Sequence, residues 1–149
     1  MRVRHGRGRA LIALAMSLVC AGAPRAVAAG ISDDSPVTLP SGNLSTEAMS
    51  IRKVLEVYIR AVEAKDVQMF RTVKPNLSDE EEKRARAAFK SIQSQVVKMN
   101  VLSLDVKDGK ATVKVSRRDT INGSIVSSFP QTFQLAKETA GWLIQDIGR

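Results

Sequence analysis

The sequence of 149 residues has few of the side chains that enzymes most often use for catalysis. It contains one cysteine, Cys20, and one histidine, His5. Aromatic residues make up 4% of the chain, with a single tryptophan and a single tyrosine. One cysteine cannot form an internal disulfide, which joins two. Cys20 and His5 both lie within the first 30 residues, so the chemistry left to the protein depends on that segment.

Residues 1–29 have the layout of a cleaved secretory signal peptide. Four arginines precede an apolar run from Ala10 to about Ala23, and small residues follow. The apolar run is shorter than the roughly 20 residues that a membrane-spanning helix needs. The small residues predict cleavage after Ala28 or after Ala29. We therefore expect export to the periplasm or the extracellular space, with no membrane span after cleavage.

Cleavage would remove both Cys20 and His5. The remaining chain would have no thiol nucleophile, no imidazole base and no thiolate or imidazole metal ligand. Cleavage would also remove five of the 23 Lys and Arg residues and none of the 15 Asp and Glu residues. The remaining 18 basic and 15 acidic residues would give a net charge of +3, compared with +8 for the whole sequence. Mixed charges with few aromatics are not typical of a nucleic-acid surface. We expect no nucleic-acid partner, no metal and no cofactor.

The rest of the chain predicts a linker and one domain. Residues 30–44 are rich in Ser, Pro, Gly and Asp without an apolar period, which favours a flexible linker. Residues 45–149 are long enough for one ordinary domain.

Three helices are expected at the start of this domain. Apolar residues at helical spacing from Ile51 to Val62 predict the first, with Ser45 as N-cap. Asp66 can cap a second helix over residues 67–73, which Pro75 ends. The sequence "SDEE" from Ser78 is a capping box and begins a third helix, predicted to run to about Met99. The inward residues of this third helix are expected to be Ala85, Phe89, Ile92, Val96 and Met99.

Four antiparallel strands are expected to follow. Asp108-Gly109 predicts a two-residue hairpin turn with Lys107 opposite Lys110. The apolar pairs are then Val106/Ala111, Leu104/Val113 and Leu102/Val115. A two-residue turn at Asn122-Gly123 would place Phe133 and Leu135 on the outer face, so we expect a bulge near Pro130. A four-residue loop over residues 137–140 would pair Leu135 with Trp142 and Phe133 with Ile144.

The predicted fold class is α+β, with three N-terminal helices packed on a curved four-stranded antiparallel sheet. The stretch "IRKVLEVYIRAVEAKDVQMFRTV" (residues 51–73), followed by a third helix and strands ending in "GWLIQDI", resembles the nuclear transport factor 2-like superfamily, which includes SnoaL-like and ketosteroid isomerase branches. The resemblance spans residues 45–147. It implies a cone-shaped, cystatin-like two-layer fold with a pocket between the first helix and the sheet. The segments "KPNL" and "ATVKVSRRD" resemble uncharacterised domains of this type in exported bacterial proteins.

The resemblance to the isomerase branch covers only part of its catalytic site. Tyr58, in "YIRA", matches the tyrosine that binds the oxyanion in that branch. The segment that carries the general base there reads "VKPNLSDEEE" here, and Asp79 lies at a predicted helix start. No residue matches the second, protonated aspartate. Tyr58 is thus either a ligand contact or a core residue with its hydroxyl at the rim.

Strand alternation extends the list of candidate ligand-binding residues. Continued from Val113 and Val115, it places Arg117 and Asp119 on the inner face. A few polar groups at one end of an apolar face are typical of a ligand site. Arg117 could instead form a structural ion pair with Asp119 or Asp146, and the bulge expected near Pro130 could turn Gln131 away. The candidates are Tyr58, Arg117, Asp119, Gln131, Trp142 and Asp146.

Three functions are compatible with this sequence. The first is an exported, non-enzymatic module that binds a small apolar or amphipathic molecule, or a partner protein, with no catalytic residue. The second is a SnoaL-like isomerase, cyclase or dehydratase that uses Tyr58 as oxyanion donor and Asp119 or Asp146 as base. The third is a dimerisation domain with a filled core, forming a homodimer through the sheet.

The signal peptide leads to a direct prediction. The intact mass of the exported protein is expected to correspond to a chain that starts at Ala29 or Gly30, measured by mass spectrometry. A mass that includes Met1 would contradict cleavage.

Overall fold

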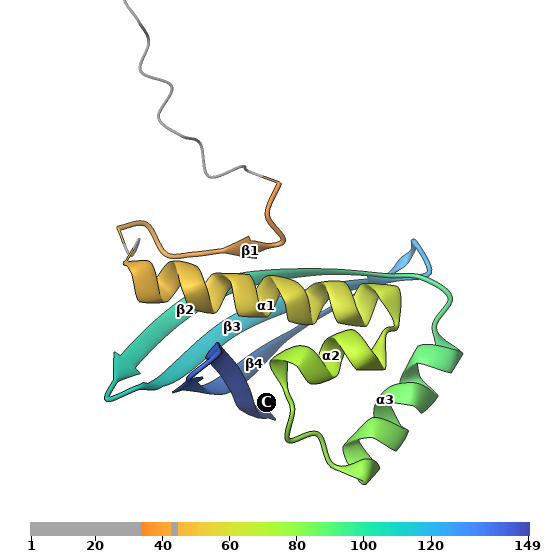
Figure 1. Cartoon of the computed structure of the whole chain (residues 1–149). Coiled ribbons are helices and arrows are strands. Elements are labelled where there is room, and N and C mark those ends of the chain that lie inside the picture. Colours follow the sequence, from red (N-terminus) through yellow and green to blue (C-terminus); the bar gives the residue numbers. More distant parts are fainter. Residues whose placement is uncertain (1–33, 43–44) are drawn as a thin grey trace, which may run out of the picture. The chain divides into compact units, whose positions relative to one another are not determined.

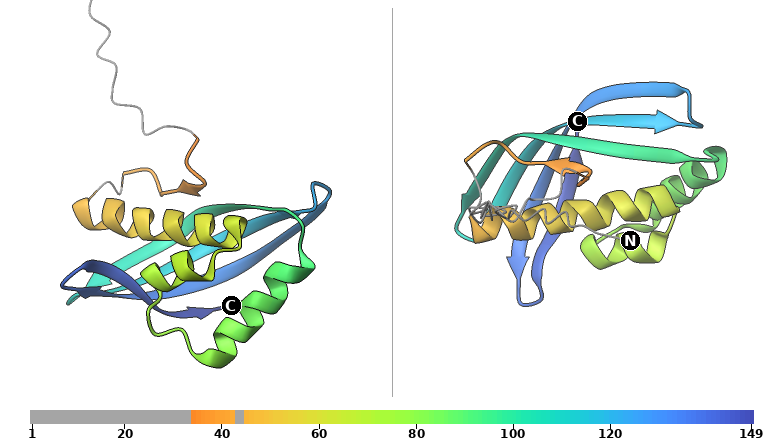
Figure 2. Two further views of the ribbon diagram at one scale, coloured as in Figure 1. Left: turned by 45° about the vertical axis from the view of Figure 1, so that its right-hand side comes forward. Right: turned by 90° about the horizontal axis from the view of Figure 1, so that it is seen from above.

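Three helices lie on one side of a five-stranded sheet in the computed structural model of the chain, which describes residues 34–42 and 45–149 (Figure 1). Figure 2 shows that, within the described residues, no helix lies on the opposite face of the sheet. The predicted signal peptide, residues 1–29, lies outside the described residues.

The first two helices begin at the predicted N-caps. Their bounds are Thr46–Ala64 for α1 and Val67–Val73 for α2. The Ser45 hydroxyl accepts a hydrogen bond from the Ala48 backbone N–H at 3.1 Å, and the Asp66 carboxylate accepts one from the Met69 N–H at 3.0 Å. These bonds satisfy backbone donors that have no partner within the helix.

The third helix, α3, spans Asp79–Ser91 and is shorter than predicted. Its capping box is confirmed, because the Glu81 N–H donates to the Ser78 hydroxyl and the Ser78 N–H donates to the Glu81 carboxylate. These bonds with Ser78 hold the pKa of Glu81 below its usual value, although burial opposes the shift. After Ser91, the N–H groups of Gln93 and Ser94 donate to the Asn122 side chain rather than to helix carbonyls.

The predicted extension of α3 to Met99 is wrong. A strand begins at Gln95, and Val97, Met99 and Val101 are buried at every second position. These buried positions have the two-residue period of a strand. Apolar residues that also fall at helical spacing hide this period in the sequence. Within α3 no residue is fully buried, but Ala85 and Phe89 of the predicted inward stripe are partly buried and Phe89 packs against the core. The rest of the predicted stripe lies beyond the end of the helix.

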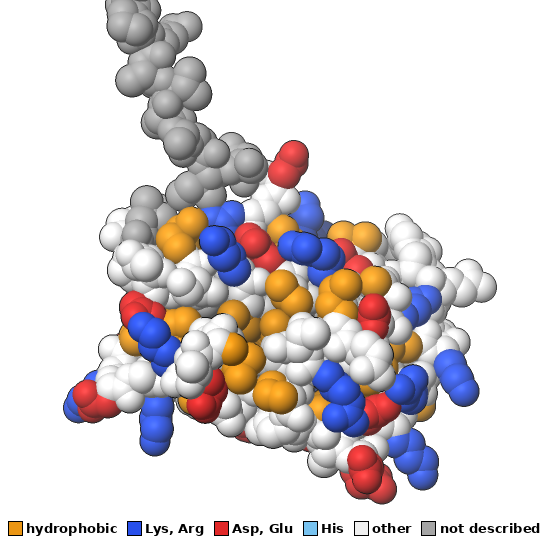
Figure 3. Space-filling view, in the orientation of Figure 1, with side chains coloured by type: hydrophobic (Ala, Val, Ile, Leu, Met, Phe, Trp, Pro, Cys, Tyr) orange, Lys and Arg blue, Asp and Glu red, His pale blue; other side chains and the backbone are white. Residues whose placement is uncertain are grey.

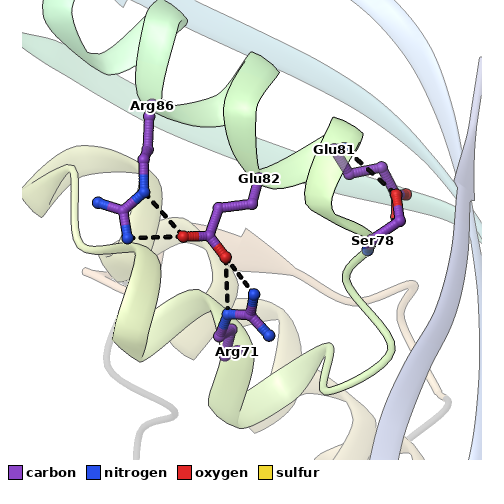
Figure 4. A network of polar contacts seen from close by, with 5 residues as sticks. All are labelled: Arg71, Ser78, Glu81, Glu82 and Arg86. Atoms are coloured by element: carbon purple, nitrogen blue, oxygen red, sulfur yellow. Dashed lines mark hydrogen bonds and ion pairs between the residues drawn. The ribbon is translucent and has the colours of Figure 1, made fainter.

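Polar contacts hold α3 in place. The Glu82 carboxylate accepts hydrogen bonds from Arg71 of α2 and from Arg86 one turn further along α3 (Figure 4). In the loop between α2 and α3, Lys74 is buried and pairs with Glu81 at 3.3 Å. The Asn76 side chain donates to the backbone oxygen of Gln145 at 2.9 Å. This part of the chain therefore depends on ion pairs and hydrogen bonds more than on apolar packing.

The sheet has five strands in chain order, one more than predicted. Four of them are antiparallel: β2 (Gln95–Lys107), β3 (Lys110–Ile121), β4 (Ile125–Glu138) and β5 (Gly141–Gly148). The extra strand, β1 (Val37–Thr38), pairs in parallel with β2, with Val37 opposite Met99. It falls within residues 30–44, where the sequence predicts a linker. The Val37 side chain is only 1% exposed, which explains why this short segment joins the sheet.

The hairpin between β2 and β3 has the predicted turn. Asp108 and Gly109 both have positive φ, at 51° and 70°, as a two-residue turn of this type requires. Lys107 lies opposite Lys110 and Leu104 opposite Val113, as predicted. The pair Leu102/Val115 is wrong because the register shifts between Val101 and Ser103. Val101 takes the place opposite Val115, and Leu102 is 58% exposed.

The bulge predicted near Pro130 does not occur. Pro130 lies opposite Ser116 in a continuous register between β3 and β4. The turn contains three residues, because Ile121 pairs with Ile125. The additional turn residue places Phe133 opposite Val113 and on the inner face, which is the result that the bulge was meant to explain.

The last hairpin also differs from its prediction. Glu138 pairs with Gly141, so the loop has two residues instead of four, and Leu135 pairs with Ile144. The register then shifts between Gln134 and Leu135, so that Phe133 lies opposite Ile147. The four residues expected on one face are nevertheless all buried: Phe133, Leu135, Trp142 and Ile144.

The contribution of the additional strand, β1, to stability can be tested by mutation. Val37→Ala is expected to lower the free energy of unfolding by about 2 kcal/mol, because it removes two buried methyl groups and leaves a cavity. Val126→Ala, at a position that is 51% exposed, is the matched control and should change it by less than about 0.5 kcal/mol. Chemical denaturation measures both. Equal effects of the two substitutions would show that β1 is not part of the core.

Candidate functional site

Four of the six candidate residues meet at one place between α1 and the sheet. Tyr58 lies on the sheet-facing side of α1, and Arg117 and Asp119 continue the inner face of β3 beyond Val115. Gln131 of β4 lies directly opposite Val115. We call Tyr58, Arg117, Asp119 and Gln131 the Arg117 cluster; all four are buried.

The Arg117 guanidinium connects the other three residues. Its Nε and Nη2 donate to the two carboxylate oxygens of Asp119 at 2.6 and 2.8 Å. Its Nη1 donates to the Tyr58 hydroxyl oxygen at 2.8 Å and to the Gln131 Oε1 at 3.3 Å. A bidentate guanidinium–carboxylate pair with further hydrogen bonds is the arrangement in which a buried ion pair is best compensated for its lost hydration.

Aromatic rings surround the cluster. The Tyr58 ring packs against Phe70 and Phe133, with centroids 5.4 and 5.2 Å apart. The Arg117 guanidinium carbon lies 5.4 Å from the centroid of the Phe129 ring, within the range of a cation–π contact. Phe129 also lies 5.5 Å from the guanidinium carbon of Arg149.

Sequence reasoning missed one polar member of this site. The Gln95 side chain donates to Asp119 Oδ2 at 2.7 Å. Gln95 was assigned to the third helix, so strand alternation was not applied to it. Alternation counted back from Val97 and Met99 would have placed it on the inner face.

The surroundings of Arg117 favour its charged form. Burial opposes the charge on Arg117, but its interactions with Tyr58 and Asp119 outweigh burial and raise the pKa of Arg117 above its ordinary value. Both oxygens of Asp119 are occupied, since they accept two N–H groups from Arg117 and one from Gln95. A carboxylate held in this way is a poor general base.

Trp142 is buried in the core, away from these contacts. Its indole N–H donates to Glu47 at 2.6 Å, near the start of α1. Glu47 also accepts a hydrogen bond from Lys137, and the bonds from Lys137 and Trp142 hold the pKa of Glu47 below its usual value. Trp142 therefore joins α1 to the last hairpin.

Asp146 does not lie where the sequence predicts. It is exposed and pairs with Gln134 on the outer face of the sheet. The register shift between Gln134 and Leu135 inverts the alternation of β5, so the inner position that was extrapolated for Asp146 is wrong. Arg117 pairs with Asp119 and not with Asp146.

A hollow of about 690 Å³ opens at the edge of the sheet beside β1, and we call it the outer groove. Its lining includes exposed side chains of the three neighbouring strands β2, β3 and β4: Lys98, Asn100, Ser116, Arg118 and Ser128. The segment around β1 contributes Asp34 and Thr38, and α1 contributes Glu63. A second hollow of about 360 Å³ shares Lys98 and Arg118 with it. On the helix-covered side, acidic and basic side chains are also interspersed (Figure 3).

Within residues 34–42 and 45–149, no three His, Cys, Asp or Glu side chains gather in a way that could hold a metal ion. In the same residues, no helix is both long enough and apolar enough to cross a membrane.

Comparison with solved structures identifies the fold. The chain is similar to a nuclear transport factor 2-like superfamily protein from Salmonella enterica serovar Typhimurium, with a TM-score of 0.60 and 15% identity over 68% of this chain and 88% of the other. It is similar to a domain of unknown function with a cystatin-like fold from Nostoc punctiforme, with a TM-score of 0.59 and 16% identity over 69% of this chain and 76% of the other. A provisionally named dehydratase of the nuclear transport factor 2-like family from Streptomyces avermitilis gives a TM-score of 0.56 and 10% identity over 68% of this chain and 93% of the other.

These similarities confirm the resemblance suggested by the sequence. The chain has the nuclear transport factor 2-like fold, an α+β architecture of three helices on an antiparallel sheet to which β1 adds a parallel edge strand. No family model matches the sequence, and no curated protein matches it. At these identities the similarity defines the fold, and the function has to be argued from the residues.

The Arg117 cluster leads to a stability prediction. Asp119→Asn removes the charge that compensates Arg117 and should lower the free energy of unfolding by about 3–5 kcal/mol. Asp146→Asn is the matched control on the outer face and should change it by less than about 0.5 kcal/mol. Urea denaturation of the two variants measures the difference. A small loss for Asp119→Asn would mean that the carboxylate is not needed to hold the fold.

Proposed function

We propose that the protein is an exported, non-enzymatic binding module that uses the outer face of its sheet. The observation that carries this proposal is the complete pairing of Asp119 with Arg117 inside the cone. Beside Tyr58, where an isomerase-like function would need a base, Arg117 and Asp119 form a buried ion pair. Export is inferred from the signal peptide that residues 1–29 predict.

The requirements of acid–base catalysis support a non-enzymatic role. A general base has to reach the proton that it abstracts, and its pKa has to suit that task. Asp119 contacts the Arg117 guanidinium, which also donates to the Tyr58 hydroxyl. The Asp119 oxygens already accept three N–H groups, two from Arg117 and one from Gln95. Releasing Asp119 for catalysis would leave the Arg117 cation buried without its partner, which is costly.

The open face of the sheet supports binding at the outer groove. Among the described residues, helices cover the inner face only. Val97 and Met99, which also line the groove, are buried, but its polar lining side chains on β2, β3 and β4 are exposed. They carry charges, hydroxyls and an amide, which provide both donors and acceptors to a partner. A small molecule with polar groups, or a polar segment of a partner protein, fits these properties better than a wholly apolar ligand does. The sequence predicts an apolar or amphipathic molecule, or a partner protein.

A SnoaL-like enzyme is the second candidate. The Tyr58 hydroxyl beside a guanidinium favours it, because Arg117 makes the phenol a better hydrogen-bond donor, and one similar structure is provisionally named a dehydratase. This function would require Asp119 or another base to reach a substrate next to Tyr58.

Dimerisation through the sheet, the third function weighed, has weaker support. Buried apolar side chains form one core cluster, as that function requires, but the central rows of the outer face are polar. The core of a stable homodimer interface is usually more apolar.

Ligand mapping by nuclear magnetic resonance separates these functions. A fragment library of apolar, neutral polar and acidic compounds is screened against the isotopically labelled protein, and backbone amide shifts locate each bound compound. We expect the shifts to cluster at Lys98, Ser116, Arg118 and Ser128, while the Trp142 indole signal stays unchanged. Shifts centred on Tyr58 and Gln131, together with chemical conversion of a bound compound, would contradict the proposal.

A further inference from the structure

We propose that the outer groove binds a small oxyanion, with Lys98 and Arg118 as the cationic partners of a phosphate or carboxylate group. This inference rests on the proposed function and names the chemistry of its site. It starts from the positions of five exposed side chains on three adjacent strands, which the register of the sheet determines.

Lys98 of β2 lies directly opposite Arg118 of β3, and Arg118 lies directly opposite Ser128 of β4. These three residues form one row across the outer face. The next row on the same face contains Asn100, Ser116 and Pro130. Side chains of neighbouring strands in one row are about 5 Å apart, and successive rows are about 7 Å apart. Two cations, two hydroxyls and one amide therefore lie within the span of a single phosphate or carboxylate compound.

The pair Lys98/Arg118 is unfavourable for the isolated sheet. Like charges directly opposite on antiparallel strands destabilise the pairing. Within the described residues, 34–42 and 45–149, no ion pair joins either side chain to a carboxylate. The nearest carboxylates on the outer face of these strands are Asp105 and Asp146. Both lie in one row, which is the third row after that of Lys98. A bound anion would remove the repulsion between the two cations.

The other groups in the groove restrict the size of the ligand. Glu63 and Asp34 also line it, so negative charge flanks the two cations. Glu63 accepts a hydrogen bond from the Val97 N–H at 2.8 Å, which fixes its carboxylate at the edge of β2. A long polyanion following the groove would meet these acids, whereas a compound with one or two anionic groups would not. Ser116, Ser128 and Asn100 can donate to its remaining oxygens.

The test uses inorganic pyrophosphate and succinate as probes, titrated into the labelled protein and followed by amide shifts. We expect at least one of them to shift the signals of Lys98, Ser116 and Arg118, with an affinity that falls as salt is added. Binding of pyrophosphate or of succinate supports the assignment and identifies the anionic group. The double variant Lys98→Gln with Arg118→Gln should weaken binding about tenfold or more, because it removes both charge-assisted hydrogen bonds.

The matched control changes two other lysines. Lys107 and Lys110 are also directly opposite each other, but they flank the hairpin turn at the far end of β2 and β3. Lys107→Gln with Lys110→Gln removes the same charge and should leave the affinity within about twofold. Equal weakening in both double variants would overturn the assignment in favour of nonspecific attraction.

Two results would separate this inference from the proposed function. If neither anion binds while neutral fragments shift the groove signals, the oxyanion assignment fails and the binding module stands. If light scattering shows a dimer and neither the probes nor the neutral fragments shift the groove signals, the oxyanion assignment and the proposed binding at the groove both fail.

Discussion

The fold depends on one constraint, the burial of only one face of the sheet. Side chains alternate between the two faces along a strand, so every residue of β3 is committed either to the helices or to the open side. From Ala111 to Asp119 this alternation is uninterrupted. Arg117 therefore points into the core, and its neighbour Arg118 points away from it. The same short stretch of chain supplies the buried cluster and the outer groove.

The constraint explains why the buried cluster is tolerated. Removing an arginine and an aspartate from water costs several kcal/mol per ion, and the Coulomb attraction offsets this only with good geometry. Here the bidentate pair, the Tyr58 hydroxyl, and the Gln95 and Gln131 amides provide that geometry. Within the described residues, no buried side-chain nitrogen or oxygen lacks a hydrogen-bond partner. The interior is thus polar at one end without carrying an unpaired charge.

Local signals in the sequence predicted much of the fold. The caps at Ser45, Asp66 and Ser78 and the turn at Asp108-Gly109 are short-range motifs, and all four occur as expected. The inward positions of Arg117 and Asp119 followed from alternation along a single unbroken strand. Neither kind of inference needs information from distant parts of the chain.

The errors arose where a register shift or a distant partner decides the structure. Leu102 and Asp146 each lie next to a shift that inverts alternation, and a shift leaves little trace in a sequence. The strand β1 forms because β2 offers an open edge, which the residues around Val37 do not encode. The third helix is predicted too long because Val96 and Met99 fall at helical spacing. The buried positions of the strand are instead Val97, Met99 and Val101, at every second residue.

The two sites differ in what a cation can do there. Arg117 is fully committed to protein groups, so its charge stabilises the interior and is not available to a ligand. Arg118 has the same side chain one position later, yet it lies in the open and faces Lys98 across the strand pair. Desolvation makes a paired charge costly to disturb inside the core, and hydration makes an exposed charge inexpensive to present to a partner. In this protein the cation available to a partner therefore lies on the open face of β3, and not between the first helix and the sheet, where the sequence resemblance predicts a pocket.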